Sequence, residues 1–127
     1  MNQEKQRIAI AAACGWADIK FHDETSPLLS KWNPHYEPGL YGKSPNPNWS
    51  GLAPIPDYLN SLDAMHEAEK ALFEGGLALS VASPGLRREL YFSQLIKVCG
   101  DHPAMSATAE QRAEAFLKTL GLWTEEE

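Results

Sequence analysis

The stretch DYLNSLDAMHEAEKAL, residues 57–72, decides the fold, because its spacing is that of one capped, amphipathic helix. Asn60 is a favourable N-cap residue, and Asp63 adds a capping-box-like carboxylate near the positive end of the helix dipole. Apolar side chains follow one face and charged side chains the other: Leu62, Met65, Ala68 and Leu72 against Asp63, Glu67, Lys70 and Glu74. Gly75 and Gly76 end the helix. We therefore predict a core helix whose acidic residues need no catalytic role.

Helices are also predicted near both ends of the chain. Residues 3–14 form the first, with Gly15 at the left-handed position after its end and Trp16 folding back as the hydrophobic residue. The last begins at the capping box Thr108–Gln111 and ends at Gly121. Its apolar stripe consists of Ala113, Phe116, Leu117 and Leu120.

A fourth helix is predicted over roughly 85–99. Pro84 opens it, with Ser83 as its cap. We expect its buried face to contain Leu86, Leu90, Leu95 and Ile96. Residues 77–83, which precede it, are consistent with either a strand or a loop.

Strands are predicted in two short segments. Over residues 17–22, Ile19 and Phe21 alternate with polar side chains, which indicates a half-buried strand. Residues 103–108 alternate well enough to form a second strand that pairs with the first. The sequence thus predicts a helix-rich α+β domain, with a small sheet and packed helices.

Residues 23–56 have a different composition. Seven of the nine prolines lie there, and no periodicity survives. A long segment without regular structure inside a compact domain is either functional or disordered. Disordered linkers are poor in aromatic residues, whereas this segment contains Trp32, Tyr36, Tyr41 and Trp49. We therefore expect a loop that folds against the core, a partner or a ligand.

The totals indicate one globular domain spanning 1–127. The chain is 43% hydrophobic and 22% charged, with a net charge of −6. The acidic balance argues against nonspecific binding to nucleic acids, which requires clustered basic residues. Cys14 and Cys99 form no CxxC pattern, and we expect both to be reduced. No segment has the length of a membrane span or a convincing signal peptide, so a cytoplasmic location is expected.

Three blocks of the sequence resemble the family called the phage ABA sandwich domain. They are IAIAAACGWADI, PDYLNSLDAMHEAEKAL and SATAEQRAEAFLKTLGLW, and together they cover about half of the chain, in order. The resemblance implies a small phage or prophage protein with an α/β/α sandwich-like fold, located in the cytoplasm of a bacterial host. It implies no reaction and no functional residues.

His66 could be one ligand of a metal site. Asp63 or Glu69 could supply a second ligand from the same helix face, and the remaining ligands would have to come from His22, His35 or His102. No HExxH motif or paired Cys/His spacing is present. We therefore predict no metal, and His66 is interpreted as a residue at the border of the core.

The motifs of nucleophilic and phosphate-binding sites are also missing. The sequence has no GxSxG motif, and neither cysteine lies in a setting that would make it a thiolate. Residues 39–44, GLYGKS, end like a phosphate-binding loop but lack its spacing. A surface turn is the simpler interpretation of this segment. We expect no cofactor, and we rank an enzyme third, behind two binding functions.

The aromatic loop is the best candidate for a binding site. Its aromatic residues and lysines could stack on a base or grip a peptide, or they could simply attach the loop to the domain. Arg87 and Arg88 begin a predicted helix and could meet an anion, although such a pair often serves only solubility. The predicted ligand-binding residues are Trp32, His35, Tyr36, Tyr41, Lys43, Trp49, Arg87 and Arg88.

Two functions follow as expectations. The first is a phage-encoded accessory protein that binds a host molecule, with a nucleotide signal of antiviral defence as the candidate ligand. The second is a protein–protein adaptor that has no small-molecule ligand and uses the proline-rich loop as its interface. A homo-oligomer is compatible with either function.

Overall fold

The computed structural model describes residues 1–23, 25–27, 37–46, 48, 51–74, 84–101 and 103–124. The elements along the chain are α1 (Gln3–Ala13), β1 (Ala17–His22), β2 (Gly39–Lys43), β3 (Leu52–Pro54), α3 (Leu62–Glu74), α4 (Pro84–Cys99), the 3-10 helix η1 (Ala104–Ser106) and α5 (Ala109–Thr119). The α+β fold class is confirmed, with a small sheet and a larger helical part.

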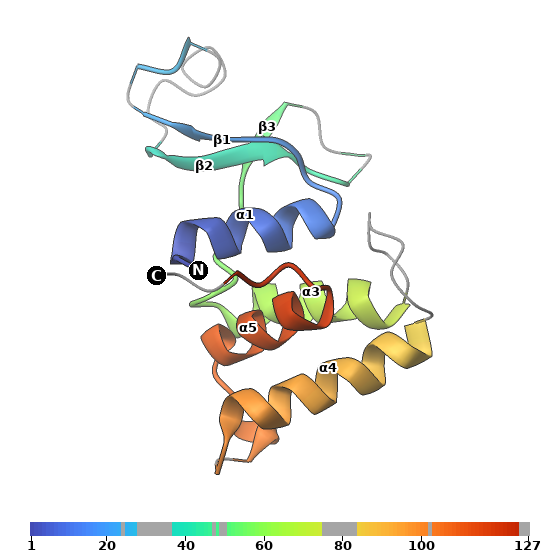
Figure 1. The fold of residues 1–127 in the computed structure, drawn as a ribbon. Coiled ribbons are helices and arrows are strands. Elements are labelled where there is room, and N and C mark those ends of the chain that lie inside the picture. The colour runs from blue at the N-terminus through green and yellow to red at the C-terminus, as the bar shows by residue number, and fades with distance from the viewer. Residues whose placement is uncertain are drawn as a thin grey trace.

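The described elements are stacked in layers (Figure 1). The sheet lies over α1, the helices α3 and α5 lie beneath α1, and α4 lies on the far side of them. All four α-helices of the described residues are therefore on one side of the sheet, so a helical layer on its other face is not among them.

The sheet is antiparallel, with the strand order β1-β2-β3. The prediction that residues 23–56 contain no regular structure was therefore wrong for Gly39–Lys43 and Leu52–Pro54. Periodicity did not reveal β2, because one of its two buried positions is the glycine Gly42. A Cβ atom there would lie 2.9 Å from the Ala17 carbonyl oxygen, so only glycine fits this close approach between strands.

The predicted strand over 103–108 was also wrong. Residues 104–106 form η1, and β1 pairs with β2 instead. The apparent alternation there reflects small residues on a tight turn, and the amide of Ala107 donates to the carbonyl of Ala104.

The strand predicted over 17–22 is confirmed as β1, but it contains a bulge. The pairing register shifts between Ala17 and Lys20, and Asp18 has a φ of 53°. Beyond the bulge, Phe21 lies opposite Leu40, so both side chains project to the same face of the sheet. Leu40 is buried there, whereas Phe21 remains 61% exposed. The expected burial of Phe21 was therefore wrong.

The helix ends follow the predicted chemistry, with one exception. After α1, the amides of Gly15 and Trp16 donate to the carbonyls of Ala12 and Ala11, at 3.1 and 3.0 Å. This is the Schellman pattern that the sequence predicts, and Gly15 has a φ of 100°.

At the other helices, the capping box of α5 is also confirmed, and the prediction for α3 is corrected. The N-cap of α3 is Ser61, not Asn60, because the Ser61 hydroxyl accepts from the amide of Ala64 at 3.2 Å. Asn60 instead donates its side-chain amide to the carboxylate of Asp57.

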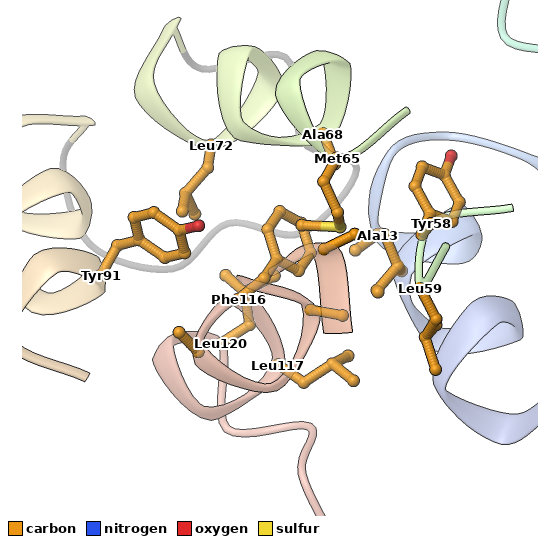
Figure 2. Packing of buried hydrophobic residues seen from close by; sticks show 14 of the residues in the cluster. Ala13, Tyr58, Leu59, Met65, Ala68, Leu72, Tyr91, Phe116, Leu117 and Leu120 are labelled. Carbon is orange, nitrogen blue, oxygen red and sulfur yellow. The ribbon is translucent and has the colours of Figure 1, made fainter. Parts of the chain in front are cut away.

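The core lies between the helices (Figure 2). Phe116 of α5 is at its centre, with Met65 and Leu72 of α3 and Tyr91 of α4 around it, and all four are fully buried.

The helix predicted over 85–99 is confirmed, but its predicted inner face was only partly right. Leu95 is buried, whereas Leu86, Leu90 and Ile96 are exposed. The inner positions are instead Arg87, Tyr91, Leu95 and Cys99. The sequence did not predict this buried face, because Arg87 and Tyr91 carry polar atoms and were not counted as apolar residues. Residues 77–83 and the proposed Ser83 cap lie outside the described residues.

Candidate functional site

The predicted aromatic site is described only in part. Trp32, His35, Tyr36 and Trp49 lie outside the described residues. The remaining members of the loop, Tyr41 and Lys43, share one face of β2. The Tyr41 hydroxyl donates to the carbonyl of Glu37 at 2.7 Å, and its ring meets that of His22 edge-on at 5.8 Å. The Lys43 ammonium lies 3.5 Å from the Asp18 carboxylate, and both are exposed.

The two predicted arginines lie elsewhere, on α4, which is separated from the sheet by the other helices (Figure 1). Arg87 is 5% exposed, and its Nε donates to the Leu72 carbonyl at 3.0 Å, so it joins α4 to α3. Arg88 places its guanidinium over the Phe73 ring, 5.4 Å from the centroid. The structure therefore does not bring the arginines together with Tyr41 and Lys43.

A cavity of about 350 Å³ lies between the start of α1, the adjoining part of the sheet and the segment that leads into α3. It combines one exposed aromatic ring with several hydrogen-bonding side chains. Its lining residues are Gln3, Glu4, Arg7, Phe21, Gly39, Leu40, Asp57, Leu59 and Asn60.

Internal hydrogen bonds order the polar side of this cavity. Arg7 donates from Nη2 to the Ile55 carbonyl at 2.7 Å, and from Nε to the Pro56 carbonyl at 3.4 Å. Asn60 donates from Nδ2 to both carboxylate oxygens of Asp57, at 3.2 Å each. The Arg7 bonds hold the segment 55–60 against α1, and the Asn60–Asp57 bonds order the segment itself.

The sequence did not reveal this cavity, for two reasons. The alternation in β1 indicated only a half-buried strand with Phe21 on its apolar side, and helix capping accounted for Asn60. Only the pairing of β1 with β2 shows that Phe21 lies beside Leu40 at an open cavity. Nothing in the sequence indicated the role of Arg7, because its partners are backbone carbonyls 48 and 49 residues away along the chain.

In the described part of the chain, His66 belongs to a group of ionic contacts that joins α3 to α5. The His66 Nδ1 lies 3.2 Å from Glu69 Oε1, but the buried carboxylate of Glu69 already meets Arg112, whose Nη1 is 3.1 Å from Oε2. No group of three or more His, Cys, Asp or Glu side chains suited to a metal ion occurs among the described residues, which exclude His35 and His102. His22 is engaged elsewhere, with Nδ1 at 2.8 Å from the Ser26 hydroxyl.

Two other groups are kept neutral by burial. Burial raises the pKa of the Cys14 thiol to about 11, which removes the thiolate that nucleophilic catalysis needs. Burial, and then the nearby Glu69 carboxylate, raise the pKa of Tyr91 far above its ordinary value. Cys14 also lines an apolar cavity of about 240 Å³ that includes Trp16 and Tyr58. Its lining also contains Glu67, whose carboxylate is 3.2 Å from the Lys70 ammonium.

Comparisons with models of protein families, with curated proteins and with solved structures give no match. The resemblance to the phage ABA sandwich family therefore stays a prediction. Within the described ranges, no helix has both the length and the apolar character that crossing a membrane requires.

Proposed function

We propose that the protein binds a small, planar, polar host molecule of the nucleotide class, and that it does so in the cavity beside Phe21. The observation that carries this proposal is the exposure of the Phe21 ring, 61%, on the wall of a cavity with hydrogen-bonding side chains. A large aromatic ring left in water forgoes about 1.5–3 kcal/mol of burial free energy. A stacked base recovers it, at about 1–3 kcal/mol per base.

The polar residues favour recognition of the base or ribose over the phosphates. Gln3 and Asn60 offer amide groups, and Asp57 offers a carboxylate that accepts from amino or hydroxyl groups. Among the described residues of the lining, Arg7 is the single basic one, and two of its nitrogens already donate to carbonyls. Because Glu4 and Asp57 repel anions, the phosphates of a bound nucleotide would extend out of the cavity.

The proposed biological role rests on the resemblance to phage proteins. A phage-encoded protein that captures a host nucleotide signal in the bacterial cytoplasm would need a binding site and no catalytic groups. The competing function is an adaptor that binds a host protein. Deleting residues 27–54 would not test it cleanly, because the deletion removes both β2 and β3.

Titration calorimetry with adenosine, ADP-ribose and cyclic dinucleotides tests the proposal. We expect at least one ligand to bind, and Phe21→Ala to weaken its affinity at least tenfold through the loss of stacking. Leu62→Ala is the matched control, because Leu62 is also an exposed apolar residue, 46%, but lies outside the cavity. Absence of binding by every ligand, or equal affinity of the Phe21→Ala variant, would refute the proposal.

A further inference from the structure

We propose that two copies of this chain associate through the outer face of α4, antiparallel and around a two-fold axis close to Ser93. The helix is 16 residues long, and one of its faces packs on α3 and α5. On the remaining surface, Leu86, Leu90 and Ile96 are 48%, 40% and 60% exposed. Three large aliphatic side chains exposed on one helix form an apolar patch of the kind that marks an interface.

Helical spacing places Leu86 and Leu90 on one stripe of this face. Leu86, Leu90, Ser93 and Lys97 follow one another at intervals of three and four, the repeat of a single helix face, and Ile96 lies on the other side of Ser93, about 120° around the helix from Leu90. All five are exposed. The buried positions Arg87, Tyr91, Leu95 and Cys99 follow the same repeat on the opposite face. The helix therefore carries exposed aliphatic side chains on the face opposite its buried one.

Charge complementarity selects a second copy as the occupant. Glu89 and Lys97 lie four residues before and four residues after Ser93, and both are exposed. A two-fold axis near Ser93 brings Glu89 of each copy to the level of Lys97 of the other. The dimer therefore contains this attraction between opposite charges twice. Within the described part of the chain, neither residue has an ion-pair partner of its own. A parallel arrangement would instead place Glu89 beside Glu89 and Lys97 beside Lys97 of the other copy, and like charges repel.

The centre of the stripe fits close approach of two helices. Ser93 is small, and exposed Gly100 lies at the same level as Leu86 of the opposite copy. Small residues at a crossing point let helix backbones approach, and larger residues pack on either side. One helix of about 24 Å per copy gives a small interface, so a dissociation constant on the order of micromolar is expected.

Sedimentation velocity over a range of protein concentrations tests the association. We expect a monomer–dimer equilibrium that Leu90→Glu and Ile96→Glu each weaken at least tenfold, because each buries a carboxylate against an apolar stripe. Leu62→Glu makes the same change on exposed Leu62 of α3 and should leave the equilibrium unaltered. Far-ultraviolet circular dichroism of each variant shows whether it remains folded.

Two further measurements test the antiparallel register. Glu89→Lys and Lys97→Glu should each weaken the dimer, whereas the double variant restores it, because the swapped charges again meet in opposite pairs. Ser93→Cys should form an intermolecular disulfide under mild oxidation, and the exposed control Ser106→Cys should not.

A chain that stays monomeric at all concentrations overturns the proposal, whatever other molecule the stripe then binds. A dimer that Ile96→Glu leaves intact overturns it as well. Phe21 is on the sheet, away from α4, so ligand binding and association fail independently (Figure 1).

Discussion

The buried ion pair between Glu69 and Arg112 gives the sharpest prediction about stability. The Arg112 Nη1 is 3.1 Å from Glu69 Oε2, and the side chains are only 13% and 8% exposed. Arg112 also donates from Nε to the Ala107 carbonyl at 3.2 Å. Arg112→Met keeps the aliphatic length of the side chain but leaves the Glu69 carboxylate buried without its main counter-charge.

The expected loss is about 3–5 kcal/mol of unfolding free energy, the usual cost of breaking a buried pair from one side. Glu69 Oε1 gives little compensation. It makes no hydrogen bond of good geometry, and the nearby His66 ring is 54% exposed, so water screens that contact. The whole domain is expected to be stable by about 5–15 kcal/mol, so the variant should fold but unfold at much lower urea.

The double variant Arg112→Met with Glu69→Leu separates the cost of the uncompensated charge from the loss of packing. Removing both charges should recover most of the lost stability, because apolar residues of similar volume replace a buried pair at little net cost. Lys118→Met is the control on the same helix. It breaks the half-buried pair with Glu114, at 3.2 Å, and should cost less than about 1 kcal/mol.

Urea unfolding at pH 7, followed by circular dichroism, measures all four proteins. A loss below 1 kcal/mol for Arg112→Met, or a double variant no more stable than the single one, would refute the reasoning that Glu69 depends on Arg112.

Three other changes have expected outcomes. Gly42→Ala places a Cβ atom 2.9 Å from the Ala17 carbonyl and should cost about 1–3 kcal/mol in urea unfolding; a neutral result would show that the strands can separate freely. Thr108→Ala removes the hydroxyl that accepts from the Gln111 amide, and a loss of about 1 kcal/mol is expected by the same measurement; no loss would mean that water replaces the cap. Burial raises the pKa of Cys14 to about 11. The native thiol therefore keeps its proton after the unfolded one has lost it, so the unfolding free energy should fall as pH rises from about 9 to about 11. Cys14→Ala should flatten this slope, and an unchanged slope would contradict the assignment.

Local signals in the sequence predicted the helices well. The capping box at Thr108 and the glycines after α1 and α5 act through bonds between near neighbours, and the structure confirms these ends. Asn60 shows the limit of such signals. Two adjacent residues could each cap α3, and the choice fell to Ser61 because Asp57 binds Asn60.

The features that the sequence could not predict depend on contacts between segments that are far apart along the chain. The inner face of α4 depends on Arg87 reaching the Leu72 carbonyl and on Tyr91 packing beside Phe73. Neither residue type indicates burial. The candidate cavity likewise depends on Arg7 meeting carbonyls at Ile55 and Pro56. Of the predicted site, only four of its eight residues are described, and they lie on two separate elements, β2 and α4, with Arg87 buried.

The edge strands of the small sheet affect how readily the concentrated protein forms fibrils. Among the described strands, β1 and β3 are the outer ones, and an open strand margin can recruit another chain into a growing fibril. Here β3 has three residues and ends at Pro54, which has no amide hydrogen to offer. On the opposite margin, the bulge at Asp18 interrupts the ladder of β1, and Lys20 adds an exposed positive charge. The sheet thus resists polymerisation on both sides, and fibril formation from the native protein should be slow even in crowded solution.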